Sequence, residues 1–217
     1  MPRLELRGRR VLITSGPTRE HLDPIRFMTN ASSGAMGFAL AEAARALGAK
    51  VTVVSGPTSL RAPRGVAVVP VVTALEMRRE TLKRSRAAVL VIGAAAVSDW
   101  RFSNKNTSRQ KIKRRPGLLR LTLVPNPDII KDAASLRRPG QVFVGFALET
   151  RRAAGHARAK LVRKGLDLIV ANGPANLSSG RARATLVWRE SVRSIPEGSK
   201  ARVARTIVAE AVKLIEL

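Results

Sequence analysis

The stretch VLITSGPT, residues 11–18, decides the fold class of this chain. An apolar run that suits a buried β-strand is followed at once by a turn of small residues. The same arrangement returns at residues 51–57 (VTVVSGP) and at residues 89–96 (VLVIGAAA). We therefore expect three buried strands in the N-terminal half, each ending in a tight turn.

Helical segments separate these strands. Residues 38–47 have apolar side chains on every side of a helix and many alanines, which favours a packed helix. A further strand is expected at residues 66–72, and Thr73 and Glu76 form a capping-box pair that begins a helix over residues 73–86. This order predicts an α/β fold, a Rossmann-like three-layer sandwich in which helices cover both faces of a mostly parallel sheet. Ligands of such sheets bind at the carboxyl ends of the strands.

The second half of the chain has a different pattern. Residues 101–117 are polar, basic and nearly free of apolar side chains, which predicts a long mobile active-site loop. Residues 118–124 alternate as a half-exposed strand does, and Pro127 is expected near the first position of a helix that begins at 126–128. The other expected elements are strands at 142–146 and 168–170, a late antiparallel strand at 185–189, and helices at 151–164 and 200–217. Because no linker is long enough to separate two domains, we expect residues 1–217 to form a single domain with a small antiparallel extension.

Composition excludes several classes of site. Cysteine is absent, which excludes disulfides, thiolate metal ligands and thiol nucleophiles. His21 and His156 are far apart in the sequence and make a poor start for a zinc site. No apolar run has the length of a membrane span and the N-terminus has no apolar signal segment, so we expect a cytoplasmic protein with no membrane partner.

The charge of the chain allows two interpretations. Forty Lys and Arg residues against fifteen Asp and Glu residues give a net charge of +25. That excess fits either a polyanionic partner such as nucleic acid or a solvated basic surface. The charges are spread along the chain and only 3% of residues are aromatic, which disfavours a surface that stacks nucleic-acid bases. Nucleic-acid binding is kept as the alternative function.

Residues 29–37, TNASSGAMG, are the first candidate for a binding site. Small residues let backbone N–H groups approach an anion, the following helix adds its dipole, and Ser32 and Ser33 add hydroxyl donors. The same pattern also fits a capped helix with a glycine-rich turn. It matches neither a P-loop nor the dinucleotide fingerprint, which disfavours a nicotinamide-dependent oxidoreductase.

Three further patterns carry candidate chemistry. The run GAAAVSD (93–99) ends at Asp99, whose carboxylate could accept a hydrogen bond from a base or ribose or hold a metal through water. Close packing of a strand on a helix, with Asp99 as a helix cap, explains the same run equally well. Lys111 and Lys113 lie on one side of an extended segment and could close over a triphosphate. Lys160 and Lys164 share a helix face. For both lysine pairs, a solvated basic surface is the simpler interpretation of the residues alone.

Taken together, these segments resemble the phosphopantothenoylcysteine synthetase family, the phosphopantothenate–cysteine ligases of the bacterial CTP-dependent type. The matching motifs lie between about residue 10 and residue 172 and follow the family's order. They are ITSGPTREHLDPIRFMTNASSGAMG (13–37), GAKVTVVSGPTSL, TALEM, AAAVSDWR, KIK, NPDI, VGFALET and KLVRKGLDLIVAN. In many bacteria this domain follows a flavin-dependent decarboxylase; the resemblance implies a stand-alone synthetase here, with the decarboxylase as a candidate separate partner.

The resemblance implies a reaction in coenzyme A biosynthesis. The carboxylate of 4′-phosphopantothenate attacks the α-phosphate of CTP and releases pyrophosphate, and the amine of L-cysteine then captures the acyl-cytidylate and releases CMP. Mg²⁺ is expected, bound mainly through the CTP phosphates, and the protein is expected to be a homodimer.

The resemblance also assigns roles to residues. Lys111 matches the lysine of the closing loop that supports formation of the acyl-cytidylate, and Asn30 matches the asparagine that binds this intermediate. The expected nucleotide-binding residues are Gly16, Ser32, Ser33, Gly34, Asp99, Lys111, Pro127, Asp128, Ile129, Ile130, Phe146, Lys160 and Lys164. Ala95 and Ala96 are expected beside the substrate, together with Asn30.

One position departs from the family pattern. Ala35 stands where the family usually has a lysine, so a positive charge is missing at the phosphate turn. Arg19 or Arg26 is expected to replace that charge; without such a replacement, activity would be reduced.

Overall fold

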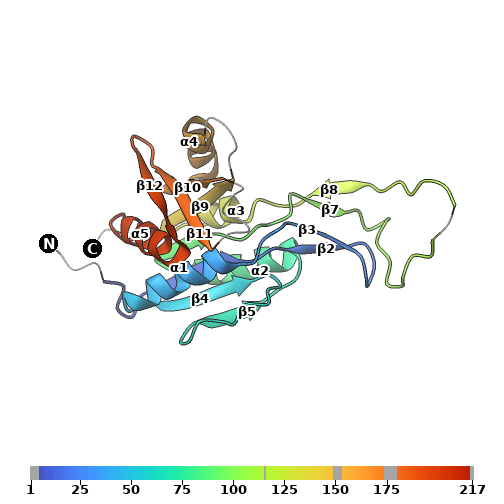
Figure 1. The fold of residues 1–217 in the computed structure, drawn as a ribbon, viewed down its shortest axis with the longest axis horizontal. Helices are drawn as coiled ribbons and strands as arrows, with labels where there is room; N and C mark the ends of the chain where they lie inside the picture. The colour runs from blue at the N-terminus through green and yellow to red at the C-terminus, as the bar shows by residue number, and fades with distance from the viewer. Residues whose placement is uncertain (1–4, 115, 149–152, 174–179, 216–217) are drawn as a thin grey trace.

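The structure, a computed structural model, describes residues 5–114, 116–148, 153–173 and 180–215. Its centre is an eight-stranded sheet in the order β12-β11-β10-β9-β6-β1-β4-β5 (Figure 1). The strands from β10 to β5 run parallel, and β11 and β12 add an antiparallel extension. The strands of this sheet are β1 (Arg10–Ser15), β4 (Lys50–Ser55), β5 (Ala67–Pro70), β6 (Leu90–Gly93), β9 (Val142–Leu148), β10 (Leu168–Asn172), β11 (Arg181–Val187) and β12 (Val192–Ser199).

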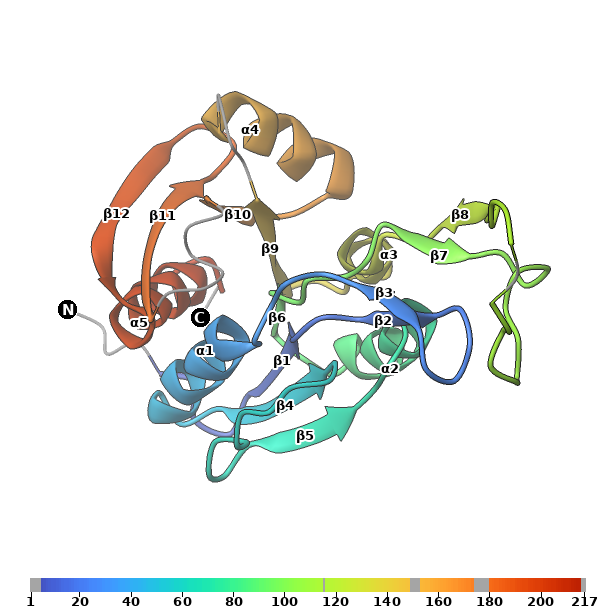
Figure 2. The same cartoon turned by 45° about the vertical axis from the view of Figure 1, so that its right-hand side comes forward.

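Five helices in the described residues cover the two faces of the sheet, as Figure 2 shows. They are α1 (Ala35–Ala46), α2 (Ala74–Ser85), α3 (Ile129–Ser135), α4 (Ala153–Lys164) and α5 (Lys200–Val212). Neighbouring strand residues point to opposite faces, so Ile13 packs in the core beneath α1 and α5, whereas Leu12 packs in the core beneath α2, α3 and α4. The predicted α/β sandwich is thus confirmed. None of the helices in the described ranges is long and apolar enough to cross a bilayer.

Two details of the expected elements are wrong. Residues 118–124 were expected to form a strand, but only Leu123–Pro125 does so (β8), and Leu118 is 90% exposed. Pro127 does not occupy the first turn of α3, because the helix is capped by Asp128 and begins at Ile129. The leucines before β8 therefore lie in an exposed segment outside the sheets. Pro127 directly precedes Asp128, the residue that caps α3.

Besides the short strand at Trp100–Phe102 (β7), three strands were not expected from the sequence. The partner of β11 is β12, whose Pro196, Glu197 and Gly198 are typical of the edge of a sheet rather than its centre. The strand expected at 185–189 is antiparallel as predicted, but it begins earlier, at Arg181. The other two are the short strands β2 (Arg19–His21) and β3 (Phe27–Thr29), which pair with each other. The parts of the expected terminal helix and of α4 at 216–217 and 151–152 lie outside the described residues.

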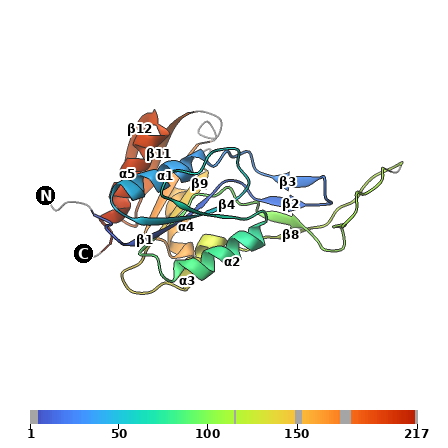
Figure 3. The ribbon, with the colours of Figure 1, turned by 90° about the horizontal axis from the view of Figure 1, so that it is seen from below.

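Two hairpins extend from the carboxyl edge of the sheet and form a projection, here called the arm (Figure 3). One hairpin is β2–β3, and the other joins β7 (Trp100–Phe102) to β8 through the loop at residues 103–122. The described residues of this loop form neither helix nor strand. The expected polar loop is therefore present, and its mobility stays a prediction.

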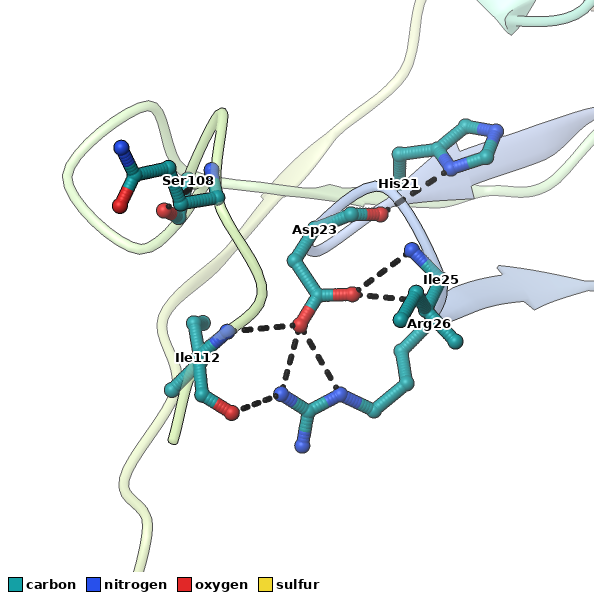
Figure 4. A network of polar contacts seen from close by, with 7 residues as sticks. His21, Asp23, Ile25, Arg26, Ser108 and Ile112 are labelled. Atoms are coloured by element: carbon teal, nitrogen blue, oxygen red, sulfur yellow. Dashed lines mark hydrogen bonds and ion pairs between the residues drawn. The ribbon is translucent and has the colours of Figure 1, made fainter. Parts of the chain in front are cut away.

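Asp23 joins the two hairpins of the arm (Figure 4). Its side chain is fully buried and accepts hydrogen bonds from the backbone N–H of Ile25, of Arg26 and of Ile112 in the loop. The Arg26 guanidinium pairs with the same carboxylate at 2.6 Å and also donates to the Ile112 carbonyl at 2.8 Å. The Arg26 side chain and these backbone donors hold the pKa of the Asp23 carboxyl well below its usual range. One buried carboxylate thus fixes the middle of the loop to the β2–β3 turn.

Candidate active site

The turn before α1, the turn after β6, the ends of β9 and β10, and residues of α4 and α5 line a cavity of about 510 Å³ at the carboxyl edge of the sheet. A second cavity of about 370 Å³ adjoins it between the end of β6 and the start of α3. Ala95, Val97, Asp99, Phe146 and Lys164 line both, so the two form one continuous site. The predicted residues that line one or both cavities are Asn30, Ser32, Ser33, Gly34, Ala95, Ala96, Asp99, Pro127, Asp128, Ile129, Ile130, Phe146, Lys160 and Lys164.

The turn before α1 presents hydrogen-bond donors to the larger cavity. Gly34 has a positive φ of 81° and caps the helix without any side-chain hydrogen bond of its own. The Ala35 N–H donates to the Ser33 Oγ at 3.4 Å, so the N–H groups of Met36 and Gly37 are the ones that remain for a ligand among the described residues. The hydroxyl of Ser15 donates to the Gly34 carbonyl at 3.0 Å and fixes the turn to the end of β1. A Cβ on Gly37 would lie 2.2 Å from the Ser15 Oγ, so only glycine allows α1 to approach the strand this closely. The geometry suits an anion better than a side-chain cap.

Asn30 connects this turn to the neighbouring strand end. Its Nδ2 donates to the carbonyls of Ala96 at 3.2 Å and Val97 at 3.0 Å. Both amide hydrogens are therefore used within the protein, and the side-chain oxygen of Asn30 remains to accept a hydrogen bond from a ligand. Asn30 holds the two walls of the larger cavity at a fixed separation.

The smaller cavity is bordered by a salt bridge. Asp128 caps α3 by accepting from the Lys131 N–H at 3.2 Å, and its other oxygen pairs with the Lys164 ammonium at 2.9 Å. On the inner side, a Cβ on Gly93 would lie 3.1 Å from Ile130, so the strand and the helix approach closely there. The cavity is narrow and lies between a glycine-bearing strand and a helix start, which suits a flat ring.

The charges around the larger cavity favour a negatively charged ligand. Among its described lining residues the cations are Lys160, Lys164 and Lys200, and the one carboxylate is Asp99. Burial lowers the pKa of the Lys200 ammonium below its usual range. Lysines in a partly enclosed cavity attract phosphate more strongly than lysines on an open surface.

Two predicted site residues lie outside both cavities. Gly16 has a positive φ of 74° and packs behind Gly34, so it supports the phosphate turn without lining the cavity. Lys111 is exposed on the arm next to Ile112 and lines neither cavity. Their assigned roles in binding and catalysis stay predictions, as do those of the residues in the cavities.

The expected replacement of the charge missing at Ala35 is not found at either arginine. Arg26 pairs with Asp23 on the arm, and the Arg19 guanidinium lies over the Phe27 ring at 4.6 Å. Neither side chain lines the cavities. Sequence reasoning also missed Thr14, Thr81 and Lys200 as lining residues. Lys200 could have been found only by predicting β12, because that strand brings it to the carboxyl edge.

The chain is similar to known proteins along nearly its whole length. The family described as the DNA/pantothenate metabolism flavoprotein C-terminal domain matches residues 6–215. The coenzyme A biosynthesis bifunctional protein CoaBC of Vibrio cholerae is 45% identical over 207 residues, covering 93% of this chain and 51% of that protein. The CoaBC protein of Bacillus subtilis is 42% identical over 211 residues, covering 94% of this chain and 51% of that protein.

A solved structure agrees with these sequence relatives. The crystal structure of the C-terminal domain of a CoaBC protein superposes with a TM-score of 0.82 at 35% identity, covering 98% of this chain and 97% of that chain. The present chain spans about half the length of the curated relatives it matches. It belongs to the family of DNA/pantothenate metabolism flavoprotein C-terminal domains.

Proposed function

We propose that this chain joins 4′-phosphopantothenate to L-cysteine, using CTP and passing through an acyl-cytidylate. The observation that carries the proposal is the pair of adjoining cavities at the carboxyl edge, one narrow and the other bordered by lysines and free helix N–H groups. A nucleotide ring fits the narrow cavity and phosphate groups fit the cationic one. The similarity to CoaBC proteins, which are named for coenzyme A biosynthesis, supports the same reaction.

In this proposal the chain acts mainly by positioning and by stabilising charge. The carboxylate oxygen of phosphopantothenate bonds to the α-phosphorus of CTP while the bond to pyrophosphate breaks. Lys160, Lys164 and the turn before α1 oppose the negative charge on the phosphates, and Asn30 keeps the turn at the correct distance from the substrate wall. The cysteine amine then bonds to the acyl carbon, and CMP leaves.

Mg²⁺ fits this site as a companion of the nucleotide. Among the described residues, no three of the types His, Cys, Asp and Glu cluster closely enough to enclose a metal ion. Mg²⁺ is commonly held by one or two carboxylates together with substrate phosphates and water. Asp99, with an exposed carboxylate on both cavities, is the residue that would hold it, and the ion would supply neutralisation of phosphate charge.

The position of Lys111 makes a second subunit part of the proposal. Its loop is fixed to Asp23 on the arm, away from the cavities of the same chain. The arm exposes large apolar side chains, including Ile25, Trp100 and Leu119, which favours burial against another chain. We propose a homodimer, in which Lys111 reaches a cavity either by release of the loop or from the partner. A cytoplasmic location and a separate flavin-dependent decarboxylase partner also stay predictions.

A pyrophosphate-release assay tests the proposed function. The full chain is incubated with CTP, phosphopantothenate and Mg²⁺, with and without cysteine, and with ATP replacing CTP in a parallel set. We expect pyrophosphate with CTP and both substrates, and an accumulated acyl-cytidylate when cysteine is omitted. Exchange of the exposed Lys83 for methionine, away from the cavities, is the control for a general effect of charge. Absence of pyrophosphate under every condition contradicts the proposal.

A further inference from the structure

The N-termini of α1 and α5 lie at the same edge of the sheet. α5 follows β12 directly, and β12 is antiparallel to β11, which is antiparallel to β10. β12 therefore ends where the parallel strands end, and Lys200, the first residue of α5, stands at the carboxyl edge. α5 packs beside α1 in the same core layer (Figure 2). Two helix N-termini, with their partial positive charges, thus face one region.

Lys200 lines the larger cavity together with the turn formed by Ser32, Ser33 and Gly34. Its backbone N–H is used within the fold, since it donates to the Gly180 carbonyl at 3.3 Å. Its ammonium group, in contrast, has no hydrogen bond or ion pair among the residues that the structure describes. The side chain is partly buried, and burial alone lowers its pKa.

A partly buried ammonium without a partner is unfavourable, because the cation loses water and gains no compensating contact. The cost disappears when an anion enters the cavity. The Asp99 carboxylate is the one acid among the described residues of the cavity wall, and no ion pair joins it to Lys200. Among the described residues no anion pairs with this ammonium group, and a negatively charged ligand would supply the missing partner.

We infer that Lys200 is a phosphate-binding residue, which contacts the same phosphate group that the Ser32–Gly34 turn receives. The inference rests on the proposed function only for the identity of the molecule that carries the phosphate. It also explains how the cavity keeps a cation at this turn although position 35 is alanine and the side chains of Arg19 and Arg26 are engaged on the arm. Lys200 reaches the turn from a different helix.

Inorganic pyrophosphate is the first probe, because it contains phosphate and nothing else that the site could recognise. Its dissociation constant is measured by calorimetry on the full chain and on K200M, K200R and the exposed-lysine control K83M. We expect K200M to weaken binding about 10- to 100-fold, the usual effect of losing one charge-assisted contact. K200R is expected to recover most of the affinity and K83M to match the unchanged chain. Circular dichroism and melting temperature confirm that each variant is folded.

Equal pyrophosphate affinity in K200M and K83M overturns the inference. If K200M binds pyrophosphate more weakly than K83M does, CTP and phosphopantothenate are titrated separately to find the source of the phosphate. The ligand whose affinity falls in K200M is the one that Lys200 holds. Adding A35K to K200M should restore part of that affinity, because both positions face one turn. No recovery in a folded double variant contradicts a shared phosphate.

These outcomes separate the inference from the proposed function. If the unchanged chain releases no pyrophosphate from CTP but binds inorganic pyrophosphate through Lys200, the ligase proposal fails and the inference stands. If the chain is an active ligase and K200M has unchanged KM values for both phosphorylated substrates, the inference fails and the ligase proposal stands.

Discussion

The cavity at the carboxyl edge and the arm carry residues that the family resemblance assigns to one reaction, yet they are held in place differently. The cavity walls are strand ends and helix starts, fixed by the core beneath them and by short contacts such as the one between Gly37 and Ser15. The loop of the arm is attached to the β2–β3 hairpin by a few polar contacts: the buried Asp23 carboxylate, the Arg26 guanidinium, and a hydrogen bond from the Ser108 N–H to the Leu22 carbonyl. The cavity is thus preorganised for binding, whereas the loop of the arm is held by a few local polar contacts whose release would move Lys111.

The largest expected effect comes from the arm. K111Q should slow pyrophosphate release about 10²–10³-fold, because a charge-assisted contact to the reacting phosphate is lost from the transition state. Binding of CTP, measured by calorimetry, should change little, since Lys111 is outside the cavities. K105M, at an exposed lysine of the same loop, is the matched control. Normal pyrophosphate release by K111Q would remove Lys111 from the mechanism.

The next effect comes from the cavity. In N30D, a carboxylate replaces the amide that donates to the carbonyls of Ala96 and Val97, so two hydrogen bonds become repulsive contacts. We expect the acyl-cytidylate to form but its conversion to product to slow about 10- to 100-fold, consistent with the loss of one or two such contacts. Mass spectrometry of the trapped intermediate, with N30S as a smaller uncharged control, measures this. Conversion at the normal rate contradicts the role of Asn30.

A smaller effect is expected at the attachment of the arm. D23N keeps the shape of the side chain but removes the charge that pairs with Arg26, so the loop should open more often. Limited trypsin digestion should cleave after Arg109 or Lys111 about tenfold faster, with the melting temperature of the core nearly unchanged.

The acid dependence of this attachment has a definite sign. The folded-state pKa of Asp23 lies below its unfolded value near 3.9. The contribution of the Asp23 carboxylate to the stability of the loop attachment is therefore present above about pH 4 and is lost as the pH falls below that value. The unchanged chain should therefore resist loop cleavage equally at pH 5 and pH 8, whereas D23N should be cleaved rapidly at both. Equal cleavage rates for D23N and the unchanged chain would contradict the importance of this contact.

The same contrast explains what could be predicted from the sequence. The parallel sheet follows from apolar runs such as 11–14 that end in small residues, and parallel strands bring their ends together, so Asp99 after β6 and Asn172 at the end of β10 line one cavity. Asn30 reaches the same cavity from the end of the β2–β3 hairpin. The arm was missed as a structure because its short strands have no apolar period, and the Asp23 contact spans 89 residues of sequence. Lys200 was missed because β12, with its proline and glycine, does not have the pattern of a strand.

The smallest expected effect lies on the inner wall of the narrow cavity. Thr81 is fully buried on α2, and its Oγ1 is the one buried side-chain N or O atom in the described residues without a hydrogen-bond partner. T81V keeps the shape and removes the unsatisfied hydroxyl, so the free energy of unfolding should rise by about 1 kcal/mol, seen as a melting temperature about 2–4 °C higher.

The matched control for Thr81 is Ser85 on the same helix, whose buried hydroxyl donates to the Leu82 carbonyl at 3.2 Å. S85A deletes a satisfied hydroxyl and should lower stability by about 1 kcal/mol, the opposite sign. If T81V is also less stable, the hydroxyl has a partner in solution, such as an ordered water. If T81V is more stable but binds CTP more weakly, the unpaired hydroxyl is maintained for the ligand at the expense of the fold. The Thr81 hydroxyl of the cavity would then resemble Lys111 on the arm, because the proposed partner of each is a ligand that is present only when the site is occupied.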